Sequence, residues 1–300
     1  MKHSGNLGGI GDTPLAREIA TNNARIHAVN AATVKTPAQT RIFTISNQKG
    51  GVGKTTTAVN LAAALAQKGL RVLVIDLDPQ GNASTALGIN HHSGIKGIYE
   101  VLTEGVDLAS VIYKSPVMEN LYCVPASIDL AGAELEIFAG YDQNERNYRL
   151  RNALRAFAET SANKLDYIFI DCPPSLGLLT VNAWSAATEV LIPIQCEYYA
   201  LEGLSQLLRN ISLIQQHLNP QLELSTILLT MYDSRTNLSA QVADDVREHF
   251  PDKVLSAVIP RSVRVSEAPS YQQPVITYDK TSPGTIAYLE AAVELANKGA

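Results

Sequence analysis

The sequence predicts one α/β domain over residues 41–300, built on a mostly parallel twisted sheet with helices on both faces. Short apolar runs, typical of strands buried on both faces, alternate with segments of helical periodicity. No internal repeat or long linker divides this region. Because strand–helix–strand units form right-handed crossovers, this alternation favours a parallel sheet covered by helices.

The first strand is expected at 42–46 and the second at 71–76, which reads RVLVID. Between them, 54–67 has an Ala- and Leu-rich helical face, and Gly69 follows as its stop. The same reading predicts strands at 121–124, 167–171, 189–194, 225–230 and 254–259, and helices near 129–139, 147–160, 201–217, 237–249 and 284–297.

Residues 1–40 are expected to form a flexible extension outside the domain, because they are rich in Gly, Asn, Ala and Thr. One weakly amphipathic helix is predicted from Pro14 to about residue 29, with Thr13 as its cap. Two interpretations remain open for the extension: a poorly ordered tail, or an arm that orders against a partner or a second subunit.

Composition narrows the class of protein. The chain has 300 residues, of which 46% are hydrophobic and 18% charged, so it is no charged disordered chain. No apolar run reaches the roughly 18 residues of a membrane span, and the first residues lack the apolar core of a signal peptide. Cys123, Cys172 and Cys196 form no CxxC pair, which argues against a disulfide framework or zinc knuckle. We therefore expect a cytoplasmic protein.

The charge balance is acidic, with 24 basic and 29 acidic residues and a formal net charge of −5. Nucleic-acid binders usually carry a basic surplus, so the average taken alone argues against that class. The net charge of the whole chain would not reveal a local cluster of arginines, which a dimer would double.

The segment after the first expected strand has the pattern of a phosphate-binding loop. It reads K-G-G-V-G-K-T-T, and a helix is expected to begin at its second lysine. Glycines let backbone N–H groups turn inward, and the helix start adds the positive end of its dipole. Lys54 can reach the β- and γ-phosphates, and the Thr55 hydroxyl can bind Mg²⁺. The residues expected to bind the nucleotide here are Lys49, Gly50, Gly51, Val52, Gly53, Lys54, Thr55 and Thr56.

This strand–loop–helix context predicts a single-domain P-loop NTPase with ATP and Mg²⁺ as its ligands. Two expected strands also end in carboxylates: Asp76 and Asp78 follow one, and Asp171 ends another. In a parallel sheet these ends lie at the edge where ligands bind. One carboxylate can hold the waters of Mg²⁺ and another can position the attacking water, and Asp171 fits the first task. Both Asp78 and Asp171 are expected to contact the metal through water, alongside Thr55. Asp76 is a supporting member.

The loop departs from the ordinary pattern, because Gln48 occupies the first glycine position and Lys49 follows it. It resembles the deviant Walker A loop of the ParA/MinD ATPase family, which includes nitrogenase iron proteins. The resemblance implies that Lys49 reaches across a dimer interface to the partner's phosphates, which would make hydrolysis depend on dimerisation. It also implies that Asp78, in a D-P-Q element, orients or deprotonates the lytic water.

Four further segments resemble the ParA/Soj partitioning branch in particular. They are 74–82 (VIDLDPQGN), 194–204 (IQCEYYALEGL), 229–238 (LTMYDSRTNL) and 259–270 (IPRSVRVSEAPS), and they leave residues 1–40 uncovered. The resemblance implies that Pro260 and Ser262 contact the adenine end of the nucleotide, although the family often has Asn at the second position. It also implies that Arg235 and Arg264 grip DNA in the nucleotide-bound dimer.

The arginine fork suits contacts with DNA phosphates. Arg261 lies three residues before Arg264, and Lys253 lies close by in the sequence, so we include Arg261 in the expected DNA-binding patch. Backbone contacts of this kind predict nonspecific, salt-sensitive binding to double-stranded DNA.

Three alternatives compete with a partitioning ATPase. A MinD-like regulator would bind membrane through a basic amphipathic C-terminal helix, but 285–300 is Ala-rich with two Glu and one Lys. An iron-protein relative would need two cluster cysteines, whereas the cysteines here are explained better as buried small hydrophobes. A DNA-binding module without catalysis would not need Lys49, Lys54, Thr55 and Asp78 together.

The preferred hypothesis is therefore a ParA-type partitioning ATPase, cytoplasmic and associated with the nucleoid. The resemblance implies an ATP-bound homodimer on nonspecific DNA, released when a ParB-like centromere-binding partner stimulates hydrolysis. An acidic monomer with little DNA affinity of its own suits such a switch.

Overall fold

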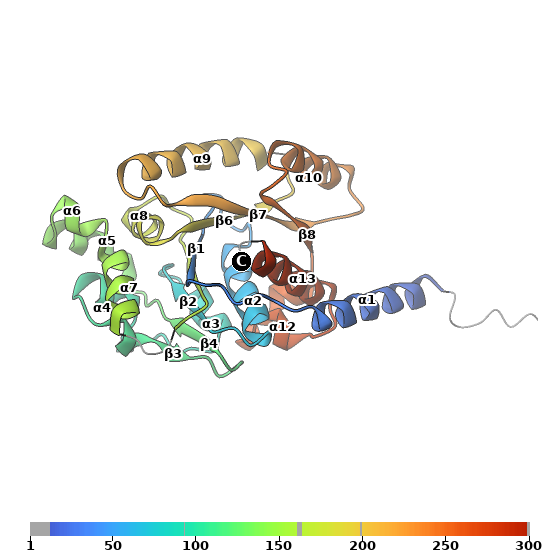
Figure 1. Ribbon diagram of the computed structural model, residues 1–300, viewed down its shortest axis with the longest axis horizontal. Coiled ribbons are helices and arrows are strands. Elements are labelled where there is room, and N and C mark those ends of the chain that lie inside the picture. The colour runs from blue at the N-terminus through green and yellow to red at the C-terminus, as the bar shows by residue number, and fades with distance from the viewer. Residues whose placement is uncertain (1–12, 93, 161–163, 199, 299–300) are drawn as a thin grey trace, which may run out of the picture.

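The computed structural model describes residues 13–92, 94–160, 164–198 and 200–298. Its centre is one eight-stranded sheet in the order β3-β4-β2-β5-β1-β6-β7-β8 (Figure 1). All neighbouring strands are parallel except β3, which runs antiparallel to β4. The strands are β1 (Arg41–Ile45), β2 (Val72–Asp76), β3 (Tyr113–Lys114), β4 (Leu121–Val124), β5 (Tyr167–Asp171), β6 (Glu189–Gln195), β7 (Glu223–Tyr232) and β8 (Val254–Pro260).

Helices connect most of these strands. The α-helices are α1 (Pro14–Ala31), α2 (Lys54–Gln67), α3 (Asn82–Ala86), α4 (Ile98–Thr103), α5 (Leu130–Gly140), α6 (Gln143–Arg146), α7 (Arg149–Thr160), α8 (Leu178–Ala186), α9 (Ala200–His217), α10 (Asn237–His249), α11 (Val263–Glu267), α12 (Val275–Tyr278) and α13 (Pro283–Asn297). The described residues also form the short 3₁₀ helices η2 (Leu108–Val111) and η3 (Ala268–Tyr271).

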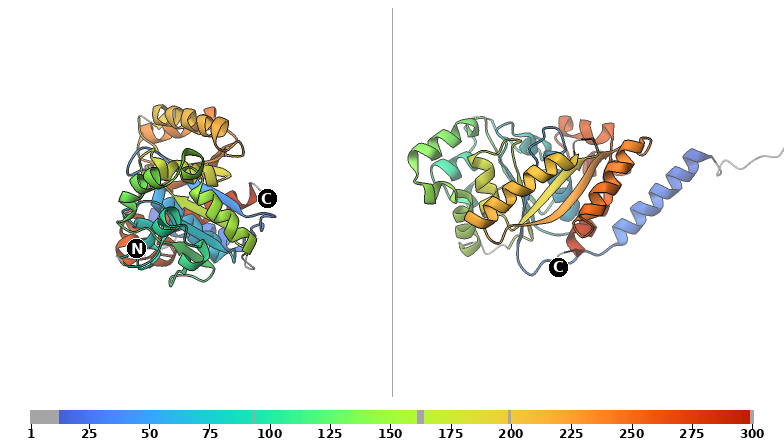
Figure 2. Two further views of the ribbon diagram at one scale, coloured as in Figure 1. Left: turned by 90° about the vertical axis from the view of Figure 1, so that its left-hand side faces the viewer. Right: turned by 90° about the horizontal axis from the view of Figure 1, so that it is seen from above.

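Both faces of the sheet are covered, so the core has two halves (Figures 1 and 2). One half packs α4, α5, α7, α8, α9 and α10 against the sheet. The other packs α2, α3, α12 and α13 against the opposite face. The predicted α/β class is confirmed, and the central strands are buried as continuous apolar runs because helices cover them on both sides.

The expected elements agree with the structure within a few residues, and the helix predicted at 54–67 has those bounds in α2. Sequence periodicity missed α8, which is buried nearly all round, polar residues included, and therefore has no amphipathic stripe. It also missed β3, a two-residue antiparallel strand at the edge of the sheet.

The C-terminal helix α13 is a packing helix. Tyr288, Leu289 and Leu295 are buried, and the helix contacts α2 and β8. No helix in the described part of the chain has the length and apolar character needed to cross a bilayer.

Helix α1 is present where the sequence predicted it, and the Thr13 hydroxyl accepts a hydrogen bond from the backbone N–H of Ala16. The helix extends away from the rest of the fold (Figures 1 and 2). Its contact with α13 includes two hydrogen bonds from Arg25 to the Glu290 carboxylate, at 2.9 and 2.6 Å. The predicted boundary at residue 40 and the flexibility of the extension stay predictions.

Candidate functional site

A glycine loop leaves the carboxyl end of β1, the strand between β5 and β6, and leads directly into α2. Gly51 and Gly53 have φ of 74° and 88°, in the left-handed region that favours glycine. Gly53 is the N-cap of α2 and supplies no side-chain cap. The first N–H groups of a 14-residue helix are therefore available to an anion at this edge of the sheet.

Neighbouring strands hold the loop in place. The Thr230 hydroxyl of β7 donates to the Val52 carbonyl at 2.9 Å. The Asn47 side-chain amide donates to the carbonyl of Pro193 in β6, also at 2.9 Å, and the Asn47 oxygen accepts from the Lys49 N–H at 3.0 Å. These bonds fix the loop before any ligand binds, which lowers the entropic cost of binding phosphate.

Lys54 lies at the centre of the candidate site. Its side chain is largely buried, with 7% relative exposure, and its ammonium donates to the Lys49 carbonyl at 3.3 Å. Burial lowers the pKa of Lys54, while the charges of Asp171 and Asp78 act in the opposite direction. The structure thus brings together Lys54 and the two carboxylates that the sequence singled out.

Asp171 is the most deeply buried carboxylate that the sequence assigned to Mg²⁺. It pairs in register with Ile45 of β1 and Asp76 of β2, so it sits at the shared carboxyl edge of the central strands. Both of its carboxylate oxygens are buried and have no hydrogen-bond partner among the described residues. Burial, followed by the Asp76 charge, raises the pKa of Asp171 well above its ordinary value, and Thr55 and Lys54 counteract the rise. A buried carboxylate with both oxygens free is suited to a cation or its bound waters.

Asp76 has a different task. One oxygen accepts from the Ser84 N–H at 2.8 Å and from the Ser84 hydroxyl at 2.7 Å, and the other accepts from the Asp78 N–H at 3.2 Å. Burial raises the pKa of Asp76 to about 6. These bonds tie the start of α3 to the end of β2. Asp76 therefore shapes the loop that carries Asp78, and this geometry defines the supporting role expected from the sequence.

Asp78 belongs to a tight turn. Its side chain accepts from the Gln80 N–H at 3.0 Å, and its carbonyl accepts from the Gly81 N–H at 2.9 Å. Gly81 has φ of 63°. The turn holds the carboxylate within electrostatic reach of Lys54.

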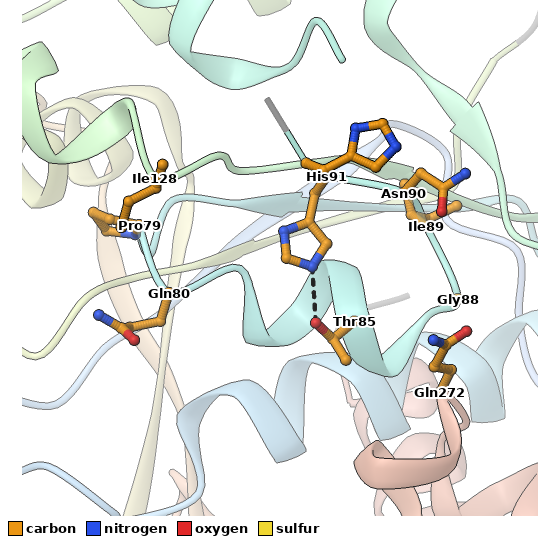
Figure 3. A pocket seen from close by; sticks show the side chains of 10 residues that line it. Pro79, Gln80, Thr85, Gly88, Ile89, Asn90, His91, Ile128 and Gln272 are labelled. Atoms are coloured by element: carbon orange, nitrogen blue, oxygen red, sulfur yellow. Dashed lines mark hydrogen bonds between the residues drawn. The ribbon is translucent and has the colours of Figure 1, made fainter. Parts of the chain in front are cut away.

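His91, which the sequence did not single out, packs against this turn. The His91 ring nitrogen Nε2 lies 2.9 Å from the Thr85 hydroxyl, which donates to the Gly81 carbonyl at 3.1 Å (Figure 3). A Cβ atom at Gly81 would lie 2.6 Å from the same ring. Pro79, Gln80 and His91 line one cavity of about 410 Å³. No sequence motif predicts this contact, because the ring reaches the backbone of the turn only through the Thr85 hydroxyl.

Lys49 is held outside the phosphate site. Its ammonium forms an ion pair with Glu197 at 2.6 Å, and the two side chains are 49% and 43% exposed. The Gln195 side-chain amide donates to the other oxygen of Glu197. The structure thus joins Lys49 to segment 194–204, one of the four segments that carry the resemblance.

Pro260 and Ser262 lie at the end of β8, on the same edge of the sheet as the phosphate loop. Strands β6 and β7 separate them from β1. Ser262 is the N-cap residue of α11, and its side chain makes no cap hydrogen bond. Their assignment to the adenine end of a nucleotide stays a prediction.

Three arginines come from neighbouring loops after β7 and β8. Arg235 follows β7, and Arg261 and Arg264 follow β8, where the Arg261 N–H donates to the Tyr232 carbonyl at 3.0 Å. Lys253 does not join them: it precedes β8, so a seven-residue strand, roughly 23 Å long, separates it from Arg261. The prediction that Lys253 lies near this patch was wrong because closeness was judged along the sequence.

Carboxylates restrain two of these arginines. Arg235 donates to both oxygens of Asp233, at 2.9 and 2.7 Å, and this contact holds the pKa of Asp233 well below its ordinary range. Arg264 pairs with Glu267 at 2.6 Å and lies 3.4 Å from Asp279. The positive charge of these arginines is therefore partly neutralised in the free chain.

Comparisons with known proteins place this geometry in context. Residues 40–224 match the family model described as an AAA domain. The chain is 52% identical over 259 residues to the sporulation initiation inhibitor protein Soj of Bacillus subtilis, covering 86% of this chain and 99% of the relative. It is also 52% identical over 255 residues to the chromosome partitioning protein ParA of Myxococcus xanthus, covering 85% and 87%.

Solved structures give the same picture. The cobyrinic acid a,c-diamide synthase of Mycobacterium smegmatis with bound ADP and magnesium is 39% identical, with a TM-score of 0.70, and the match covers 85% of this chain and 93% of that one. The cell division ATPase MinD of Pyrococcus furiosus is 27% identical, with a TM-score of 0.68, and the match covers 85% and 98%.

Proposed function

We propose that this chain, which belongs to the Soj/ParA family of chromosome-partitioning ATPases, uses ATP to control its binding to nonspecific DNA. Family membership and the phosphate loop make it an ATPase. The observation that carries the finer proposal is a buried Lys54 whose ammonium feels the charges of Asp171 and Asp78 and donates to the carbonyl of the half-exposed Lys49.

The residues present fit Mg²⁺ bound with ATP. The two unpartnered oxygens of Asp171 and the Thr55 hydroxyl would hold the ion and its waters, and Asp78 would stand near them. When bound, Mg²⁺ would neutralise charge on the phosphates. The relative from Mycobacterium smegmatis binds magnesium together with ADP or an ATP analogue.

The chain's own groups would perform the remaining tasks. The N–H groups of the glycine loop and the Lys54 ammonium bind the phosphates and stabilise the charge that develops on the transferred phosphoryl group. Asp78, fixed by its turn, orients the attacking water and accepts its proton. Lys49 of each subunit would reach the other subunit's phosphates, so that hydrolysis depends on a dimer.

The ion pair with Glu197 would control whether Lys49 is available to a second subunit. In the monomer its ammonium is bound to Glu197 of the same chain, and this contact must break before it can cross to a second subunit. The proposed dimer therefore competes with an exposed ion pair of the kind that stabilises by about 0–1 kcal/mol.

Replacing Glu197 by glutamine is expected to strengthen ATP-dependent dimerisation by up to about fivefold, because it removes a competitor worth up to ~1 kcal/mol. Sedimentation equilibrium with a nonhydrolysable ATP analogue measures the effect. Glu119→Gln breaks another exposed lysine–glutamate pair, the one with Lys114, and should leave the dimer unchanged. A weaker dimer in Glu197→Gln would show that this carboxylate works across the interface instead.

DNA binding would use Arg235, Arg261 and Arg264 from each subunit, brought together by the dimer. Their present carboxylate partners and the acidic net charge of −5 keep the affinity of the monomer low. A ParB-like centromere-bound partner would stimulate hydrolysis and release the dimer. The proposed location is the cytoplasm, on the nucleoid.

The proposal is tested by nonspecific double-stranded DNA binding with ATP and with ADP. ATP should give salt-sensitive binding and ADP should give little. Arg235→Ala or Arg264→Ala should weaken the ATP-dependent binding by at least about tenfold while dimerisation persists, because each arginine makes charged hydrogen bonds to phosphate. Arg209→Ala, on the exposed face of α9, is the matched control. Equal DNA binding with both nucleotides would overturn the proposed switch.

A further inference from the structure

A second cavity lies at the opposite edge of the sheet from the phosphate loop. It has a volume of about 490 Å³ and is bounded by the first residues of β1, one face of α7, the end of α8 and the loop before β7. Its apolar lining includes Ile42, Leu154, Ala158, Ala186 and Pro220.

Two positive charges face this cavity without a negative partner. Arg151 and Arg155 lie one helical turn apart on α7, and both line it. Among the described residues, neither forms an ion pair with a carboxylate. The Arg151 guanidinium lies 3.7 Å from the Tyr148 ring centroid, and its Nε atom is buried with no hydrogen-bond partner in the described part of the chain. Burial and the neighbouring Arg155 charge lower the pKa of Arg151.

Arg149, at the start of the same helix, has the hydrogen-bond acceptor that the Arg151 Nε atom lacks among the described residues. Arg149 donates its Nε hydrogen to the Leu102 carbonyl at 2.9 Å and lies over the Tyr141 ring at 3.9 Å. Like charges at (i, i+4) on a helix disfavour the fold by a few tenths of a kcal/mol, so the unpaired couple costs stability in the free chain.

A buried hydroxyl in the same cavity is also unsatisfied. Ser185, at the end of α8, has 0% relative exposure, and its Oγ atom has no hydrogen-bond partner among the described residues. Nearby, the Asn219 side-chain amide is fully used, since it donates to the carbonyls of Trp184 and Ala187 at 2.8 and 2.7 Å. Buried polar atoms are normally paired, so the unpaired Ser185 hydroxyl could donate a hydrogen bond to a ligand in the cavity.

From these observations we infer that the cavity between α7 and α8 binds a small organic carboxylate with an apolar body. Arg151 and Arg155 would bind the carboxylate, Ser185 would add a hydrogen bond, and the aliphatic lining would cover the body. A nucleic-acid phosphate is a poorer match, because backbone binding uses broad basic surfaces, whereas these arginines border an apolar hollow.

The test uses the full chain and 3-phenylpropionate as the probe, followed by isothermal titration and by NMR shifts. The probe should bind saturably, at least about tenfold more tightly than 3-phenylpropanamide, which has no charge, and than acetate, which has no apolar body. The double variant Arg151→Gln/Arg155→Gln should lose this binding by at least about tenfold, and Ser185→Ala should weaken it less. Arg209→Gln is the matched control.

Retained ATP hydrolysis and an unchanged circular dichroism spectrum in the double variant establish that it is folded. Equal binding of the acid and the amide, or equal binding by the chain and the double variant, would overturn the inference. A duplex DNA titration is the third arm: if the double variant loses DNA affinity while the carboxylate fails to bind wild type, the arginines belong to a nucleic-acid surface and the inference is wrong.

Discussion

Replacing Lys54 by alanine is expected to weaken ATP binding by at least about a hundredfold and to abolish measurable hydrolysis. Lys54 is a buried positive charge, only 7% exposed, on which the charges of Asp171 and Asp78 act. Without it, polyphosphate would enter a site whose nearest charged groups are carboxylates. Loss of one buried charge partner costs about 3–5 kcal/mol, which corresponds to a hundredfold or more in affinity.

Fluorescence titration with a labelled ATP analogue measures the binding, and phosphate release measures the hydrolysis. Lys114→Ala removes an exposed lysine that pairs with Glu119, and should leave both values unchanged. Near-normal ATP affinity in Lys54→Ala would mean that the glycine loop binds phosphate through its backbone alone.

The same variant should also change the stability of the apo chain. Asp171 and Asp78 lose a neighbouring positive charge, and the pKa of Asp171, already raised by burial, should rise further. The unfolding midpoint must therefore be measured beside the affinity, so that loss of binding is not mistaken for loss of fold.

The positions of the candidate residues were largely predictable, because these residues are close in sequence to strand ends. The phosphate loop, Asp78 and Asp171 each follow an apolar run, and parallel strands bring such ends to one edge. Their convergence around Lys54 needed only the sheet and no detailed side-chain packing.

Contacts between distant segments were not predictable. Lys49 and Glu197 are 148 positions apart, and nothing in either segment encodes the other. The pairing of Asp76 with Ser84 and the contact of His91 with the Asp78 turn depend on where α3 and the following loop pack. Lys253 shows the opposite error. It is close to Arg261 in sequence, but the two residues flank β8 and therefore lie at opposite edges of the sheet.

Asp78→Ala is expected to preserve ATP binding while reducing hydrolysis by at least about a hundredfold, the usual range for removing a general base. In the proposed cycle this variant would remain dimeric and bound to DNA when ATP is present, because release requires hydrolysis. Single-turnover phosphate release and DNA retention, measured on the same samples, separate the two effects. Asp244→Ala, which removes an exposed carboxylate of α10, is the control.

The turn around Asp78 makes a second variant necessary. Alanine also removes the acceptor of the Gln80 N–H, so the loop itself could change shape. Asp78→Asn keeps an oxygen in that position and removes only the negative charge, so it should retain the turn and still fail to hydrolyse ATP. If Asp78→Asn hydrolyses ATP at the normal rate, Asp78 serves the backbone of the turn and does not act on the water. If Asp78→Asn stays on DNA with ATP as firmly as Asp78→Ala, the carboxylate charge is what ends the DNA-bound state.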